Sequence, residues 1–311
     1  MKIGLLVALF ASAFRLATPL ILSSLGGIFS EKSGVVNIAL EGIMIMGAFF
    51  SVLTVKYIPN AWVGVLIAMI VGMITASLLA VLAIHLKANQ VVAGVAINLL
   101  AASLVAFIIN IVWNGASRTG EAAVFLNANP FKFLEGIPVL GEFFAGLSPF
   151  TYLAIILVAI SYYVLNKTAF GLRIRAVGEH PKAADTVGID VYKIRYIAVI
   201  LSGAFAGLSG ASLTLGAVPI FNTGMTAGKG FIAIAAMIFG KWRTFGALGA
   251  SLFFGFAESI KIQAGTIGLT SVPSSFLSMI PYVATVIALV LFVGKSVGPS
   301  ASGKPYEKGH R

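Results

Sequence analysis

Long apolar runs alternate with short polar connections along almost the whole chain. Most of these runs approach the roughly 20 residues with which a helix crosses the hydrocarbon of a bilayer. The pattern therefore predicts an all-α, polytopic membrane helix bundle of about eight or nine transmembrane segments. The expected segments are residues 4–25, 35–55, 61–84, 91–113, 149–166, 197–217, 225–240, 244–260 and 276–293.

Composition supports this prediction and excludes a soluble domain. Hydrophobic residues make up 59% of the chain and charged residues only 10%, whereas a soluble chain is about 25% charged. The mean hydropathy is +1.02. We expect one transmembrane domain over residues 1–295, followed by a flexible basic tail over residues 296–311.

The net charge of +11 would suggest nucleic acid as a partner of a soluble protein. In a membrane protein, Lys and Arg instead collect in cytoplasmic loops. Loop 167–195 has six basic residues against three acidic ones, so we expect this loop and the C-terminal tail in the cytoplasm. Loop 114–148 has two basic and three acidic residues and is expected outside the cell. No nucleic-acid partner is predicted.

The stretch "GGIFSEKSG" (26–34) predicts a discontinuous helix near residues 26–34. Non-helical backbone at membrane depth is tolerated only where protein or a water-filled cavity surrounds it. Just beyond this stretch, Asn37 and Glu41 lie on one helical face. A charged carboxylate at mid-bilayer costs about 2.5–3.5 kcal/mol on insertion scales. Glu41 should therefore face the bundle interior.

Two roles are open for these polar side chains. Either they join helices through hydrogen bonds, or they line a pathway for a solute. Asn37, Glu41 and Asn98 are the candidates for the pathway.

Small residues mark a site of close helix packing. Gly203, Gly207 and Gly210 fall in "LSGAFAGLSGASLTLG", and the first two have GxxxG spacing. Small residues four apart let two helix backbones approach closely in lipid. The alternative is that the small-residue groove gives access to a substrate.

The chain has no motif for catalysis or metal binding that we can identify. It contains no cysteine, and its three histidines, His85, His180 and His310, share no ligand spacing. The stretch "GMTAGKG" (224–230) has three residues rather than four between its glycines, and Gly230 stands where a phosphate loop needs Ser or Thr. We therefore expect no enzyme activity, no metal and no cofactor bound by this chain.

A short helix is predicted within loop 167–195. In "GEHPKAADTVGID", Pro181 suits a first helical turn and Gly188 suits a helix stop. Ala183, Ala184 and Val187 give the helix a small apolar face. A helix of about two turns is unstable alone, so it is either a solvated connector or a bearing for a cytoplasmic partner.

Three ordered stretches resemble a known family. They are "SEKSGVVNIALEGIMIMGAF", "GLRIRAVGEHPKAADTVGIDVYKIRY" and "GKGFIAIAAMIFGKWRTFGALGASLFFGFAES". Together they resemble the ABC-transporter permeases of the branched-chain amino acid and ribose type, and are most similar to those that import nucleosides or simple sugars.

The resemblance implies a transport subunit in a bacterial inner membrane, acting on an uncharged solute, with a nucleoside preferred. It implies three protein partners: a second, homologous permease in a heterodimer, an ABC ATPase that uses the ATP, and an extracellular binding protein or lipoprotein. It also implies that the short helix is the coupling helix for the ATPase. The matching residues are Gly178, Glu179, Pro181, Ala183, Ala184, Gly188 and Ile189.

A secondary transporter is the alternative function. Protons or sodium would then act through intramembrane acids such as Glu41 and Glu258. We expect Glu258 to pair with Lys261 near the outer end of its helix.

Overall fold

The computed structural model describes residues 2–122, 124, 126, 137, 140–264, eight positions between 276 and 290, and residues 297–308. Seven helices in these residues are long and apolar enough to cross a membrane. The prediction of an all-α polytopic membrane bundle is confirmed. More than half of the expected segment 276–293 lies outside the described residues.

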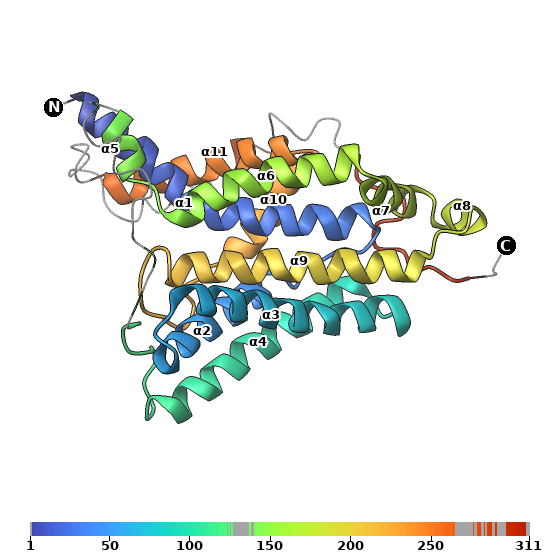
Figure 1. Ribbon diagram of the computed structural model, residues 1–311, viewed down its shortest axis with the longest axis horizontal. Coiled ribbons are helices and arrows are strands. Elements are labelled where there is room, and N and C mark those ends of the chain that lie inside the picture. Colours follow the sequence, from blue (N-terminus) through green and yellow to red (C-terminus); the bar gives the residue numbers. More distant parts are fainter. Residues whose placement is uncertain are drawn as a thin grey trace.

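The helices follow one another along the chain in the order shown in Figure 1. Helix α3 continues directly into a one-turn π-helix, η1. The bounds are α1 Lys2–Lys32, α2 Leu40–Tyr57, α3 Ala61–Ala80, η1 Val81–His85, α4 Gln90–Val112, α5 Leu140–Ala145, α6 Pro149–Lys167, α7 Ala169–Glu179, α8 Pro181–Thr186, α9 Val191–Thr214, α10 Lys229–Phe239 and α11 Thr244–Gln263.

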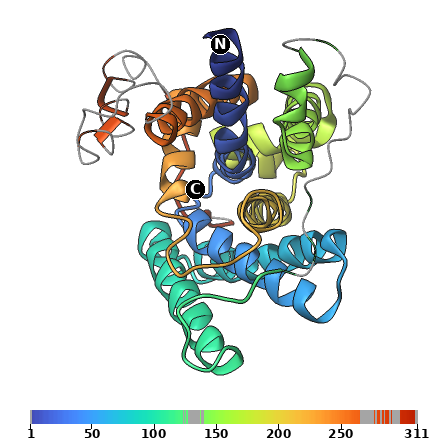
Figure 2. The same cartoon turned by 90° about the vertical axis from the view of Figure 1, so that its left-hand side faces the viewer.

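Helix α9 forms the centre of the bundle. Seen along its axis in Figure 2, it has α2, α3 and α4 on one side and α1, α6, α10 and α11 on the other. Its buried share of 83% is the largest among the candidate spans, whereas α3 and α4 are only 33% buried. The outer helices therefore present apolar side chains to lipid, while α9 is surrounded by protein.

Glycines on α9 bring neighbouring backbones into direct contact. A methyl group at Gly203 would collide with Ala76 and with the carbonyl of Gly72, both on α3. One at Gly207 would collide with the backbone of Ala68, and one at Gly210 with that of α2. The three glycines thus lie where helices approach most closely, as small residues do in lipid.

The two ends of the bundle differ in charge. We call the end that carries α7, α8 and the C-terminal residues 297–308 the basic end. It also carries the turns after α1, η1 and α10, and the N-terminus of α1 lies at the opposite end (Figure 1). Basic residues at this end include Lys32, Lys87, Arg173, Arg175, Lys182, Lys193, Lys241 and Arg243.

The predicted helix break near 26–34 is wrong in position. Helix α1 continues through Gly26 and Gly27 to Lys32, and the non-helical stretch is 33–39. The two glycines serve packing instead: a Cβ at Gly26 would lie 2.8 Å from the carbonyl oxygen of Ser202 on α9, and one at Gly27 would lie 3.0 Å from the sulfur of Met237 on α10. A second discontinuity is α10, whose 11 residues are too few to cross a bilayer.

The C-terminal tail was expected to be flexible, but its described residues pack against the bundle. Ala301 N–H donates to Gly178 O at 2.9 Å, and Gly303 N–H donates to Gly34 O at 3.2 Å. Tyr306 is buried. These contacts join the tail to the break after α1 and to the end of α7.

Candidate functional site

The backbone between α1 and α2 is held by its own serines. Ser33 Oγ donates to Ser30 O at 2.7 Å, and Ser30 Oγ donates to Val35 O at 2.7 Å. Gly34 has φ +92°, a conformation that L side chains rarely adopt. A buried stretch without helical hydrogen bonds needs such partners, and these residues supply them where α1 ends.

Glu41 lies in the first turn of α2 and holds the start of α10. Its Oε1 accepts from Gly228 N–H at 2.9 Å and its Oε2 accepts from Gly230 N–H at 2.6 Å. The side chain is only 8% exposed. The first N–H groups of a helix have no partner within the helix, and the helix dipole favours a negative charge at that end. Glu41 therefore satisfies and neutralises the α10 terminus inside the bundle.

The close approach of α10 to Glu41 explains the glycines there. A Cβ at Gly230 would lie 2.5 Å from the backbone of Glu41 itself. Gly228 has φ +79°. Any side chain at Gly230 would push α10 away from Glu41. The hydrogen bonds between Glu41 and the start of α10 therefore require the glycines of "GKG" (228–230).

An ion pair lies next to this contact. Lys229 Nζ is 3.4 Å from Glu258 Oε1 on α11, and both side chains are at least three-quarters buried. Glu258 was expected to pair with Lys261, which is wrong, because the first residue of α10 comes closer. The start of α10 is thus tied to α2 by Glu41 and to α11 by Lys229.

The two asparagines also connect helices near the break. Asn37 Nδ2 donates to Ser202 Oγ at 2.9 Å. Asn98 Oδ1 accepts from Gly42 N–H at 2.7 Å, and its Nδ2 donates to Ile38 O at 3.0 Å. The three predicted pathway candidates therefore meet around residues 37–42. Asn37 Oδ1 is buried and has no hydrogen-bond partner among the described residues.

Helix α8 was expected to present Ala183, Ala184 and Val187 on one apolar face. The structure separates them: Ala184 is 3% exposed and packs inside the bundle, whereas Val187 is 76% exposed and Ala183 is also exposed. A residue that is already covered cannot be gripped by a partner. The outward face of α8 is therefore Lys182, Ala183, Thr186 and Val187.

The ends of α8 have the predicted chemistry. Pro181 is its first residue, and Gly188 ends it with φ +84°. Ile189 N–H donates to Ala184 O and Gly188 N–H to Asp185 O, a pattern close to the Schellman motif. The backbone of α8 is thus fixed at both termini.

The C-terminal tail contacts α8 and the end of α7. Glu179 Oε2 accepts from Ser300 Oγ at 2.8 Å. Burial and a hydrogen bond with Asp185 raise the pKa of Tyr306 to about 12. Gly178 touches the carbonyl of Lys32 so closely that no side chain fits. The loop that contains α7 and α8 therefore contacts the break after α1.

Arg195 was counted among the loop charges, but the structure buries it at 1% exposure. Its Nε donates to Ser33 O and its Nη1 to Lys304 O, both at 3.1 Å. It thus binds the break and the tail together. In the sequence, the burial of Arg195 is indicated only by its spacing. It lies on the same face of α9 as the buried residues Val191, Ile194 and Ala198.

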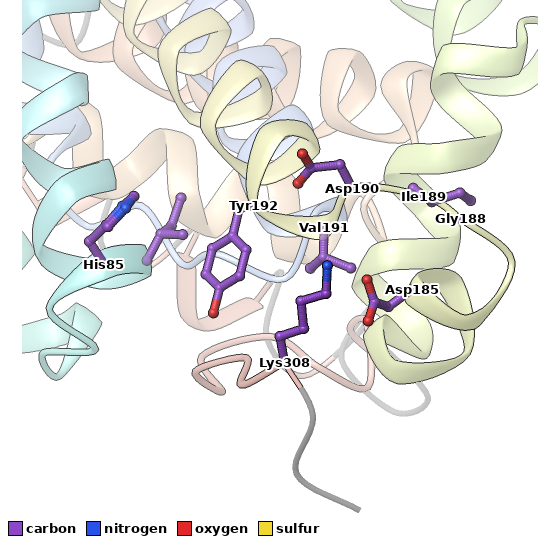
Figure 3. Close-up of a pocket in the computed structure, with 9 residues that line it drawn as sticks. His85, Asp185, Gly188, Ile189, Asp190, Val191, Tyr192 and Lys308 are labelled. Carbon is purple, nitrogen blue, oxygen red and sulfur yellow. The ribbon is translucent and has the colours of Figure 1, made fainter.

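A cavity of about 610 Å³ opens between η1 and the junction of α8 with α9. His85, Tyr192 and Lys308 converge on it from three separate segments, and Asp185 and Asp190 lie at its side (Figure 3). His85 Nδ1 is 2.6 Å from Tyr196 Oη, which fixes the end of η1 to α9. In the described residues, no group of three or more His, Asp or Glu is placed to hold a metal ion.

The fold defines a polytopic membrane protein whose buried polar groups fix two helix discontinuities, a feature that many transport proteins share. A family model described as the permease component of branched-chain amino acid transport systems matches residues 9–294. The chain belongs to this family of permeases, and is thus a transport subunit rather than an enzyme.

Individual relatives extend over nearly the whole chain. The chain is 46% identical to the guanosine ABC transporter permease protein NupQ of Bacillus subtilis, over 95% of both chains. It is 42% identical to the nucleoside ABC transporter permease protein NupC of Lactococcus lactis, over 98% of both. A second guanosine permease of B. subtilis, NupP, is 28% identical over 91% of this chain and 80% of its own. No solved structure matches the chain significantly.

Glu41 is expected to be needed as an acceptor for two N–H groups. Glu41→Ala leaves both unpaired in the bundle, at about 1–3 kcal/mol each. Glu41→Gln keeps one acceptor and should lose about half as much. The thermal unfolding temperature of the detergent-purified chain measures this loss of stability. It should be highest for the wild type, lower for Glu41→Gln and lowest for Glu41→Ala. The exposed Glu121, changed in the same two ways, should show no difference. Equal loss with Gln and Ala would mean that ionisation, not acceptor number, matters.

Proposed function

We propose that this permease is the translocation subunit of an ATP-driven importer of nucleosides. The observation that carries the proposal is the similarity to guanosine and nucleoside permeases over nearly the full length. The alternative of a proton- or sodium-coupled carrier lacks comparable support. Glu41 and Glu258, the acids it needs, are engaged with the start of α10.

Uptake by the reconstituted complex tests this function. With its ATPase and binding protein in vesicles, the chain should take up labelled guanosine only when ATP is present, and collapse of the proton gradient should leave uptake unchanged. Uptake of leucine or ribose without guanosine would overturn the substrate. Uptake that survives ATP removal but not gradient collapse would overturn the energy source.

We infer that the basic end lies in the cytoplasm of a bacterial cell and that α1 begins outside. The excess of Lys and Arg at that end supports this orientation, and so does the tail, which is joined there to α7 and to the break after α1.

Cysteine labelling checks the orientation without interference, because the chain has no native cysteine. Lys182→Cys on α8 should react with an impermeant maleimide only in inverted membranes. Val218→Cys, at the opposite end and 48% exposed, should react only in intact cells. The reverse pattern would invert the topology.

The outward face of α8 is proposed as the contact for the ATPase. Val187 is a large apolar side chain that is 76% exposed at the C-terminal end of α8, next in sequence to Gly188, which lines the cavity near η1 (Figure 3). The short helix α8 is fixed at both ends by Pro181 and Gly188 and leaves this face exposed, so it offers a rigid contact surface. Glu179, Pro181 and Gly188 would act by setting the position of α8, and Ala184 by holding it to the bundle.

The contacts between α8 and the bundle connect α8 to the two helix discontinuities. Gly178 touches Lys32, Arg195 binds the break at Ser33, and the break leads into Glu41 and the start of α10. A displacement of α8 would therefore reach both helix discontinuities. Alternating access requires such an element with two arrangements close in free energy. Asn37, Glu41 and Asn98 would then shape the pathway by positioning α2, α9 and α10.

A second, related permease is proposed as the other half of the pathway. B. subtilis has two guanosine permeases, and this chain is much more similar to NupQ than to NupP. That difference supports a heterodimer of unlike chains, served by an extracellular binding protein or lipoprotein.

Val187→Arg should weaken ATPase association about tenfold, the loss of a contact worth about 1.4 kcal/mol, and leave folding intact. Ala184→Arg should instead lower the unfolding temperature, because the site is filled and overpacking costs about 1–3 kcal/mol. Co-purification of the ATPase and thermal unfolding of the same preparations separate the two effects. Val218→Arg, at the opposite end, is the control. If Val187→Arg leaves ATPase association unchanged, α8 is only a connector and not the contact for the ATPase.

A further inference from the structure

A groove of about 560 Å³ lies beside the turn between α10 and α11, at the basic end. Its apolar walls include Phe239, Phe245 and Phe253. Lys241 and Arg243 stand at its mouth, and both are exposed. Phe245 and Phe253 are partly bare as well. The groove therefore opens on the outer surface of the bundle.

Gly249 keeps the groove open. A Cβ built on this residue meets no atom within 4 Å, in contrast to Gly246, where it would strike the backbone of Gly240. A glycine inside a helix costs about 0.5–1 kcal/mol relative to alanine. The close contact with α10 accounts for Gly246, but no contact with the described residues accounts for Gly249. Its missing side chain leaves space in the groove for a ligand.

The mouth of the groove is positively charged. Within the part of the chain that the structure describes, neither Lys241 nor Arg243 takes part in an ion pair. The nearby Glu31 is already bound by Trp242 Nε1 at 2.6 Å. Lys32 lies close enough to interact electrostatically with Arg243 and with Arg175. These cations favour an anion at the turn.

The cations and the apolar wall follow one another along α11. Gly249 lies six positions after Arg243 and Phe253 lies ten, which is about 9 Å and 15 Å along a helix. A ligand that fits carries its negative charge at one end and an apolar chain of this length behind it. A phospholipid at the membrane surface has this arrangement, and basic pockets at cytoplasmic helix ends bind anionic head groups.

We propose that this groove binds an anionic phospholipid of the inner leaflet. Its phosphate lies between Lys241 and Arg243, and one acyl chain crosses Gly249 between Phe245 and Phe253. The lipid then fastens the turn that also holds the end of α1 through Trp242 and Glu31.

Native mass spectrometry of the detergent-purified full chain tests the site. Phosphatidylglycerol and phosphatidylcholine with identical acyl chains are titrated separately, and the dissociation constant of the first bound lipid is measured. Each cation near a membrane surface contributes about fivefold to the binding of an anionic lipid. Phosphatidylglycerol should therefore bind at least about fivefold tighter than phosphatidylcholine, and Lys241→Gln with Arg243→Gln should remove that difference.

Two further variants separate the groove from general surface charge. Gly249→Phe places a ring in the groove from a position where the added Cβ meets no described atom within 4 Å, and it should weaken both lipids. Ala96→Phe, which adds the same ring on the exposed face of α4, should weaken neither. Arg173→Gln with Lys193→Gln removes two exposed charges at the same end and should leave the preference intact.

Equal affinity of the wild type for the two lipids would overturn the proposal. A preference that survives loss of Lys241 and Arg243, or that falls equally with Arg173 and Lys193, would also overturn it. If Gly249→Phe leaves both affinities unchanged, no acyl chain lies in the groove.

Discussion

The carboxylate of Glu41 is the contact on which the arrangement of the bundle depends. A helix that begins inside the membrane exposes N–H groups that water cannot reach. Glu41 meets two of them at the start of α10, and Lys229 connects the same turn to α11. The cost of placing an acid in the bundle is offset because the helix terminus supplies both hydrogen bonds and a favourable dipole. The short α10 can therefore start at mid-bundle.

The glycines of α9 impose the second constraint. With no side chains at Gly203, Gly207 and Gly210, the backbones of α2 and α3 lie directly on α9. Helices in lipid gain little from hydrophobic burial against each other, so dispersion contacts and interhelical hydrogen bonds hold them. Ser51 on α2 and Thr214 on α9 form such a bond at 2.8 Å, and Asn37, in the break before α2, adds a bond to Ser202 on α9 at 2.9 Å. The half of the bundle built on α2, α3 and α9 is thus a tightly packed unit.

The contacts at the basic end connect the unit of α2, α3 and α9 to the outward face of α8, the proposed contact for the ATPase. Arg195 places its guanidinium between the break after α1 and the tail, and uses backbone carbonyls as acceptors. The tail in turn lies under α7 and α8, and Lys87 adds an ion pair to Glu307 at 2.6 Å. The break, the tail and the loop that contains α7 and α8 consequently form one connected assembly. The α10–α11 turn reaches it as well, through Trp242 and Glu31.

The sequence by itself determined the class of fold, because apolar run length and the near absence of charge leave a chain few alternatives to membrane helices. It also predicted that Glu41 faces the bundle interior, since a buried acid is costly without a partner, and the side chain is buried. Only the tertiary structure decided which groups these side chains contact. Glu41 binds N–H groups almost 190 positions away, Ala184 faces inward and Arg195 is buried, because these outcomes depend on which helices pack together. Local patterns also misplaced the break at 26–34: two glycines in a row can end a helix or let another helix approach, and the neighbours on α9 and α10 decide which.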